Sequence, residues 1–441
     1  MGAEMNFPAK FAEPAWPRWG AFRHPSFTVI WTASIVLNIG NAMFDTSSAW
    51  LMTSLNADPM AVSLVQVATA LPVVLFTLPA GVLADTIDSR RLLIAVQVSG
   101  AALMAILATL TSLSRVTPAG LLLAIFLSSA SLSLGAPAWL SITPLLVRRR
   151  ELDGAAAANG VGHNIGRAAG PTLGGLAIGA LGIAGPFWIA CAACLVAVAA
   201  LLWWRPPARR LPSERFSVAV RAGLRYAAGS RHLRATSMRG VAFFIFASAS
   251  WALLPLVARN QIAQGPICYG VLMSAIGAGA IGGSLALNSL RRGLRPDGIL
   301  VLATIGAALA LVLFAVARAP VLAASASLIA GASSAMVLAS LYASLQISLP
   351  EHLRARGLAI FLSAFFAALT LGSLVWGRIA AMGGLPLAYF LAAAGILLAI
   401  PLARRWKLIR VAEFDPVQAT PTLSSVGLTL DPNEPRGWRS I

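Results

Sequence analysis

Twelve apolar segments, each close to or above the length needed to cross a lipid bilayer, dominate this chain of 441 residues. A helix needs about 20 predominantly apolar residues to span the hydrocarbon core. The segments are 27–55, 60–84, 92–113, 118–146, 155–181, 185–204, 240–257, 269–290, 298–317, 321–349, 357–380 and 385–403. Only 11% of the residues are charged, whereas soluble domains carry about 25%. The sequence therefore predicts an all-α membrane protein with twelve transmembrane helices.

The distribution of Lys and Arg predicts the orientation of these helices. If the N-terminus is cytoplasmic, 28 of the 33 basic residues fall on the cytoplasmic side and only Arg115, Arg259 and Arg318 on the other. Basic loops stay in the cytoplasm, so we expect both termini inside and a multi-pass protein of the cell (inner) membrane. The basic residues lie between apolar runs and form no face interleaved with aromatic residues, so the net charge of +18 does not indicate nucleic-acid binding.

The segments divide the chain into two halves of six helices. We expect a cytoplasmic N-terminal arm (1–26), a first bundle (27–204), a cytoplasmic linker (205–239), a second bundle (240–404) and a disordered cytoplasmic tail (405–441). Within the linker, 216–228 has the pattern of an amphipathic helix at the membrane surface. The related stretches 144–150 and 350–356 follow the fourth and tenth segments, which suggests parallel repeats.

The loop after the second segment carries a recognisable motif. It contains Gly81, Asp85, Asp88, Arg90 and Arg91. It resembles the signature loop of the major facilitator superfamily, G-x-x-x-D-(R/K)-x-G-(R/K)-(R/K), although Thr86, Asp88 and Ser89 depart from that pattern. The resemblance implies a conformational latch, in which Gly81 permits close helix approach and Asp85 faces a helix N-terminus or an Arg of the other half. The alternative is ordinary flanking charge on the cytoplasmic side.

The fifth segment contains a run of small residues around a proline. The run comprises Gly166, Gly170, Pro171, Gly174 and Gly175. It resembles the G-x-x-x-G-P-x-x-G-G motif of proton antiporters in the same superfamily, which implies an exporter. Glycines at four-residue spacing allow close packing, and a proline frees a carbonyl and bends the helix. Generic small-residue packing would use the same residue types.

A wider resemblance covers about residues 22–406. It is carried by 38–40, 50–55, 64–66, 78–85, 136–139, 164–167, 223–226, 252–258, 269–270 and 354–356. These stretches look like the enterobactin-exporter-like branch of the major facilitator superfamily. The resemblance implies the major facilitator fold and proton-driven export of a small amphipathic molecule, siderophore-like or drug-like.

Asp45 is the one acidic residue well inside an apolar segment. A charge at the bilayer centre costs roughly 2.5–3.5 kcal/mol or more, so such residues are functional candidates. Asn38, Asn41 and Asp45 share one helical face and would line a central cavity. There Asp45 would hold a proton near neutral pH and couple transport to protons. The alternative is a structural carboxylate that is paired with Arg or hydrogen-bonded.

A second polar stripe, Asn159, His163 and Arg167, lies on the fifth segment beside Asn164. We hypothesise an Asp45–Arg167 ion pair that proton binding weakens, and a proton-coupling role for His163, which titrates near neutral pH. A lone helical His is otherwise a structural hydrogen-bonding group. In the second half, Trp251, Tyr342 and Gln346 are further cavity candidates, although packing or an interfacial aromatic belt would also explain them.

The motifs that are missing limit the function. The sequence has no G-x-x-x-x-G-K-(S/T) loop, so a gradient must supply the energy. It also lacks the clustered acids, His or Cys of an enzyme site, and we expect no enzyme activity, cofactor or metal. Three hypotheses remain: a monomeric proton-coupled exporter, an uptake permease of the same fold, and a membrane scaffold or enzyme. The sequence leaves open both the substrate and the choice between proton and sodium coupling.

Overall fold

Every regular element in the computed structural model, which describes residues 20–205, 230–349 and 351–403, is a helix. Ten of these helices are long and apolar enough to cross a membrane. The N-terminal arm before residue 20, the predicted amphipathic helix 216–228 and the tail lie outside the described residues. The all-α membrane class is confirmed.

The first half contains six long helices. They are α1 (Pro25–Leu55), α2 (Pro59–Thr86), α3 (Ser89–Ser112), α4 (Pro118–Leu146), α5 (Leu152–Leu181) and α6 (Gly185–Trp203), with short 3-10 turns η1 (Gly20–Arg23) and η2 (Arg149–Glu151). Proline opens α1, α2 and α4, where its missing N–H costs no helical hydrogen bond. Asp58 and Thr117 cap α2 and α4 through their side chains. Proline and capping residues thus set the helix starts.

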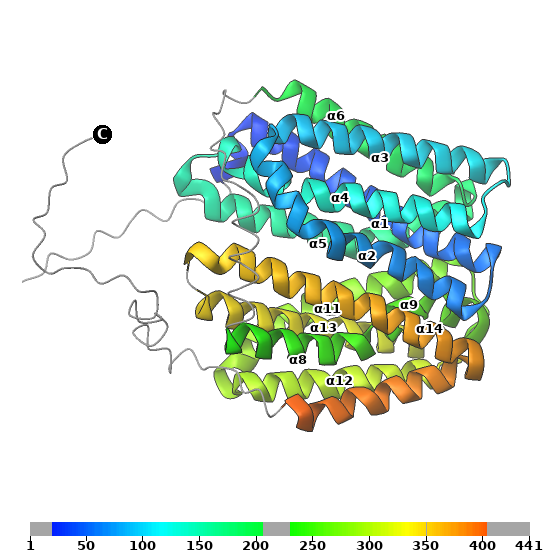
Figure 1. Cartoon of the computed structure of the whole chain (residues 1–441). Coiled ribbons are helices and arrows are strands. Elements are labelled where there is room, and N and C mark those ends of the chain that lie inside the picture. Colours follow the sequence, from blue (N-terminus) through cyan, green and yellow to red (C-terminus); the bar gives the residue numbers. More distant parts are fainter. Residues whose placement is uncertain (1–19, 206–229, 350, 404–441) are drawn as a thin grey trace, which may run out of the picture.

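The second half repeats this pattern with one broken helix and one folded helix. It comprises α8 (Arg231–Ala247), α9 (Ala249–Ala252), α10 (Leu254–Leu256), η3 (Val257–Gln261), α11 (Pro266–Gly293), α12 (Pro296–Val316), α13 (Pro320–Ser348) and α14 (Glu351–Ala403). The elements from α8 to η3 follow one another as a single apolar helical segment with short breaks, and this segment ends in a π-helical turn. Within α14, Gly384 has φ 81°, and Figure 1 shows the chain reversing direction there. Glycine adopts this left-handed conformation without the steric cost of a Cβ.

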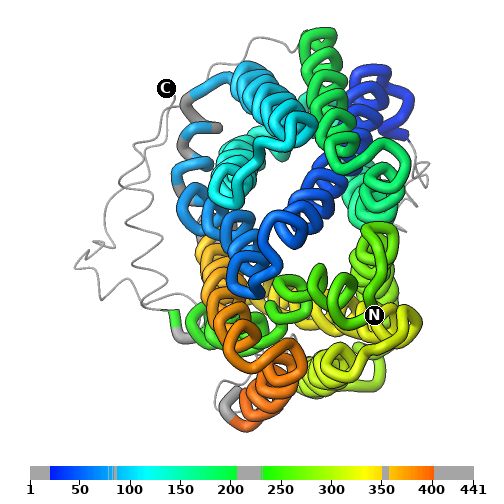
Figure 2. Tube along the Cα trace, turned by 90° about the vertical axis from the view of Figure 1, so that its right-hand side faces the viewer, coloured from blue at the N-terminus to red at the C-terminus, as the bar shows by residue number. Residues whose placement is uncertain are grey.

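The two halves lie side by side, with α1–α6 above α8–α14 in Figure 1. Helices α5 and α11 form one interface between the halves, and α2 and α14 form the other. Seen end-on in Figure 2, the helices of each half group around their own interior. We call the end where α1 begins, α6 ends and α8 begins the linker side, and the opposite end the far side.

The η1 turn attaches the start of α1 to the loop between α4 and α5. His24 Nε2 lies 2.7 Å from Glu151 Oε2, and Phe22 packs edge-on against Phe27 and Trp31. The hydrogen bond with His24 holds the pKa of Glu151 below its ordinary value. The linker-side end of the first half is therefore tied together by local contacts.

The second half begins earlier than the sequence indicated. Helix α8 starts at Arg231, so the last nine residues of the predicted linker are helical. Arg239, which we expected in a cytoplasmic loop, is buried with 8% of its surface exposed and pairs with Asp297 at 2.6 Å. The expectation of a loop at 231–239 was wrong, because an ion pair between two helices allows the helix to continue through a buried charged residue.

Within the second half, α11 and α13 approach so closely that only glycine fits. A Cβ at Gly279 would overlap the backbone carbonyl of Leu328, and one at Gly331 would overlap that of Ile276. A Cβ at Gly282, on the same α11, would meet no atom of the described chain within 4 Å.

We predict that Gly279→Ala lowers the melting temperature of the purified protein. A methyl group forced against backbone lowers the free energy of unfolding by about 1–3 kcal/mol, because α11 and α13 would have to move apart to make room for it. Gly282→Ala is the matched control, and it should leave the melting temperature unchanged or raise it, since alanine favours helix by about 0.5–1 kcal/mol. Equal melting temperatures for the two variants would contradict the close approach.

Candidate functional site

A cavity of about 480 Å3 lies inside the first half, between α1, α3, α4 and α5. Its polar lining residues are Ser34, Asn38, Asn41, Gln97, Thr143, Asn159 and His163. Its aromatic lining residues are Phe27, Trp31 and Trp139, and aliphatic side chains complete the wall. An apolar pocket with a few convergent polar groups is the usual form of a small-molecule site.

The two predicted polar stripes meet in this cavity. Asn38 and Asn41 enter from α1, and Asn159 and His163 enter from α5. The Trp31 Nε1–H donates to the carbonyl of Ala158 at 2.9 Å, and Asn159 Nδ2 donates to Thr143 Oγ1 at 3.2 Å. These bonds fix the aromatic and amide walls relative to each other. Asn164 is exposed on another face of α5 and does not line the cavity.

Gln97 of α3 lines the cavity, although the sequence alone did not predict it there. Its side chain is 2% exposed, and Nε2 has no hydrogen-bond partner among the described residues. A buried amide without a partner costs about 1–3 kcal/mol, so this position calls for a ligand or another explanation. Gln97 is the one amide side chain in the segment 92–113, and this was the available signal.

Asp45 lies one turn beyond Asn41 on α1, toward the far side. The neighbouring helices do not cover its side chain completely, and it lies within electrostatic range of Tyr269 on α11. No ion pair joins it to another described residue. The carboxylate thus lies at the junction between the two halves.

The hypothesised Asp45–Arg167 pair is not formed in this structure. Gly166 packs on Asn38, which places Arg167 near the level of Asn38, whereas Gly174, which packs on Met43 and Thr46, is level with Asp45. Seven residues of helix separate these levels, which is roughly 10 Å at 1.5 Å per residue. Arg167 lies instead within electrostatic range of His163 on its own helix.

The glycine-rich face of α5 lies between α1 and α11. A Cβ at Gly166 would come within 2.7 Å of Asn38, and Gly170 meets Ala42. On the other face, a Cβ at Gly175 would lie 2.6 Å from the carbonyl oxygen of Pro266, and Pro171 contacts Gly270. Thr172 contributes both its N–H and its hydroxyl group to hydrogen bonds with Ser274 Oγ, at 3.1 and 2.8 Å. The motif therefore brings three helices and both halves into backbone contact.

A group that we call the far-side cluster closes the opposite end. It consists of Trp50, Thr53 and Ser54 of α1, Arg259 of η3 and Tyr269 of α11. Arg259 donates to Thr53 Oγ1 at 3.0 Å and to Ser54 Oγ at 2.8 Å. Its guanidinium lies 5.7 Å above the Trp50 ring, and that ring stacks on Tyr269 at 6.1 Å. The sequence showed Arg259 only as one of three basic residues on its side of the membrane.

The signature loop makes contacts within its own half. Asp88 caps α3 by accepting from the Arg91 N–H at 2.9 Å, and Arg90 donates to the carbonyls of Leu201 and Leu202 at the end of α6. No described atom lies within 4 Å of where a Cβ at Gly81 would be, so no close approach is seen there among the described residues. The Asp85 side chain lies outside the described residues.

The candidates from the second half do not join the cavity. Trp251 and Tyr342 are partly buried, Tyr342 packing edge-on against Phe361, and Gln346 is exposed one turn along α13. None of the three lines the first-half cavity.

Comparison with known proteins agrees with this architecture. The model of a family described as transmembrane secretion effector matches residues 17–436. Proteins named "Enterobactin exporter EntS" are similar in sequence: the one from Salmonella choleraesuis (strain SC-B67) is 30% identical over 57% of this chain and 60% of its own length. The one from Escherichia coli O1:K1 / APEC is 29% identical over 68% of this chain and 72% of its own length. The chain thus matches about 60% of the length of the first of these relatives.

Solved structures show the same fold. Nucleoside transporter NupG (D323A mutant) superposes with a TM-score of 0.74 at 12% identity, covering 86% of this chain and 99% of its own. A bacterial homologue of the human lysosomal transporter Spinster, in an inward-facing and unoccupied conformation, gives 0.65 at 14% identity, covering 90% and 99%. The resemblance to the major facilitator superfamily is confirmed by the family model, and the solved structures share its fold.

We predict that Gln97→Leu raises the melting temperature of the ligand-free protein by an amount equivalent to about 1 kcal/mol. The substitution removes a buried amide that has no partner and keeps a similar volume. Trp31→Phe is the contrasting variant, which should lower the melting temperature because it breaks the bond to Ala158. A drop for Gln97→Leu as large as that for Trp31→Phe would show that the Gln97 amide is satisfied.

Proposed function

Because the chain belongs to the transmembrane secretion effector family, we propose that it exports a small amphipathic molecule across the cytoplasmic membrane by proton antiport. In this proposal twelve spans, including both arms of α14, form two six-helix bundles, and both termini are cytoplasmic. The named exporters among its relatives support the direction of transport.

The chemistry of the first-half cavity carries this proposal. Tryptophan and aliphatic walls suit an apolar or aromatic body, while Asn38, Asn41 and Asn159 offer both donors and acceptors. No acidic residue is among those that line the cavity. The site therefore favours an uncharged or weakly acidic amphipathic substrate of the siderophore-like or drug-like class over a strongly cationic one. Gln97 is positioned to bind a hydrogen-bonding group of that substrate.

Access to the cavity would be from the linker side. Hydrogen bonds between described residues of the two halves gather at Thr172–Ser274 and in the far-side cluster. Along α5, Asn159, His163 and Arg167 are exposed, whereas Gly170, Pro171 and Gly174 are buried. With cytoplasmic termini this is an inward-facing state, which is the state that loads an export substrate.

Asp45 would couple protons to this cycle. It lies between the cavity and the far-side cluster, next to Tyr269, which stacks under Trp50 and thus connects to Arg259. Protonation of Asp45 changes the charge at this junction and so alters the balance between the two access states. In this proposal Arg167 and His163 also take part in proton coupling, and the loop from Gly81 to Arg91 latches the linker side in the outward-facing state.

We predict that Asp45→Asn abolishes substrate accumulation driven by an acidic interior in everted membrane vesicles. The probe is a compound selected by thermal shift from siderophores, antibiotics and lipophilic cations, since specific binding raises apparent stability. Asparagine cannot release a proton, so accumulation should fall to the level of vesicles without the transporter.

Asp58→Asn is the matched control, because it removes an acidic residue from the far side while asparagine still caps α2. Its accumulation should equal that of the unaltered protein. Full proton-driven accumulation by Asp45→Asn would remove Asp45 from the mechanism. Accumulation in the opposite vesicle orientation would favour the uptake permease.

A second prediction concerns the far-side cluster. Arg259→Gln removes a charged donor and the cation–π contact, so the far-side-open population should rise about tenfold, which corresponds to about 1.4 kcal/mol. The measurement is labelling of native Cys268, next to Tyr269, by a membrane-impermeant maleimide. Cys191 and Cys194 are buried in α6 and serve as unlabelled references. Arg318→Gln, at another far-side arginine, should leave the rate unchanged, and an equal rate for both variants would argue against a closing role.

A further inference from the structure

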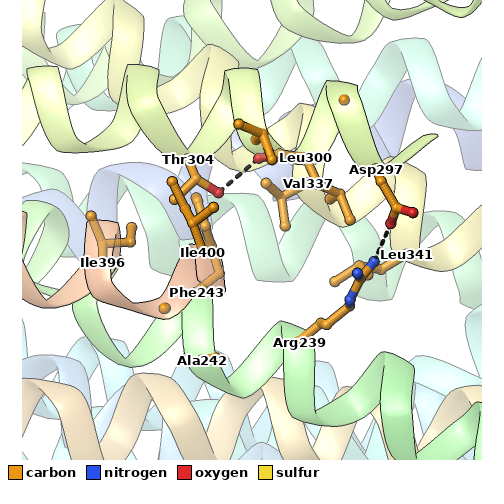
Figure 3. Close-up of a pocket in the computed structure, with 13 residues that line it drawn as sticks. Arg239, Ala242, Phe243, Asp297, Leu300, Thr304, Val337, Leu341, Ile396 and Ile400 are labelled. Carbon is orange, nitrogen blue, oxygen red and sulfur yellow. Dashed lines mark hydrogen bonds and ion pairs between the residues drawn. The ribbon is translucent and has the colours of Figure 1, made fainter. Parts of the chain in front are cut away.

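A second cavity, of about 450 Å3, lies inside the second half, between α8, α12, α13 and α14. It shares no lining residue with the first-half cavity. Its walls are almost wholly apolar, and Figure 3 shows Ile396 and Ile400 of α14 on one side and an ion pair on the other. Its volume is within the range of about 300–1,000 Å3 that is typical of ligand pockets.

The ion pair forms the polar end of this cavity. Arg239 NH1 donates to Asp297 Oδ1 at 2.6 Å, which is a short bond between two charged groups. The one hydroxyl group in the lining, that of Thr304, donates to the carbonyl of Leu300 in its own helix (Figure 3). A ligand with a charged group would therefore meet Arg239 and Asp297.

A ligand can displace Asp297 from the ion pair more easily than it can displace Arg239. The Arg239 side chain is 7% exposed, whereas the Asp297 side chain is 46% exposed in the first turn of α12. Withdrawing Asp297 to water costs little, because it is already half hydrated. Removing the carboxylate partner of the buried Arg239 raises the free energy of the protein unless another anion takes its place. A ligand that replaces Asp297 is thus favoured over one that replaces Arg239.

We propose that this cavity is a second binding site, which takes a single-chain amphiphile with a carboxylate head group, such as a free fatty acid. The carboxylate binds Arg239 in place of Asp297, and the hydrocarbon chain lies along Phe243, Leu300 and Ile396. Asp297 competes for the same guanidinium and lowers the affinity. This site does not depend on the export function of the first-half cavity.

The test uses the full-length protein in phosphatidylcholine nanodiscs, with empty nanodiscs subtracted. Laurate and its uncharged counterpart dodecanol are titrated by calorimetry. Asp297→Asn removes the competing charge, and laurate should bind about tenfold more tightly to this variant while the affinity for dodecanol stays unchanged. Gly282→Ala, on α11 and outside the lining of both cavities, should leave both affinities as they are.

Val337→Phe places a larger side chain in the cavity wall and should weaken binding of both probes at least tenfold; its melting temperature reports whether it folds. The proposal is overturned if Asp297→Asn leaves laurate affinity unchanged or lowers it. It is equally overturned if dodecanol gains as much as laurate, or if folded Val337→Phe binds laurate as the unaltered protein does.

Discussion

Close backbone contact along α5 is the constraint on which the two-halved structure depends. In a bilayer, apolar side chains gain nothing by leaving lipid for one another, so helices associate through tight packing and hydrogen bonds. Gly166 and Gly170 bring α5 against α1, and Gly175 brings it against α11. Because α1 supplies Asn38 and Asn41 to the cavity, the glycines of this one helix both join the halves and place the amide groups of the site.

Polar residues inside the molecule follow a second rule, since the hydrocarbon core offers no water to satisfy them. Arg239 pairs with Asp297, Arg259 binds two hydroxyl groups and an aromatic face, and the Trp31 indole donates to a backbone carbonyl. Gln97 departs from this rule in the described chain, because its amide nitrogen is buried without a partner. Other buried groups, such as the Tyr389 hydroxyl, also have no partner among the described residues, but Gln97 lies in the wall of the cavity that we propose as the substrate site.

The sequence predicted the all-helical membrane class and the convergence of two polar stripes, because both follow from helical periodicity. Asn38 with Asn41, and Asn159 with His163, each share a face whatever the partner helix is. The Asp45–Arg167 pair failed because periodicity gives the face of a residue but not its depth, and depth depends on the offset of α1 against α5. Arg239 was misplaced since its partner Asp297 lies 58 residues away. The roles of Arg259 and Gln97 were not predicted, because each depends on contacts with other helices that the local sequence does not show.

Pro171 has a consequence that reaches beyond the bend in α5. A proline has no N–H, so the carbonyl of Arg167, one turn earlier, loses its helical partner. A Cβ at Gly277 would lie 2.7 Å from that oxygen, so this carbonyl faces bare α11 backbone rather than a side chain. If one bundle rotates against the other, the pivot would lie at this contact, because backbone packs on backbone and no side chains need to rearrange. A larger side chain at Gly277 would therefore lower the rate of exchange between the two states before it changed which molecule is bound.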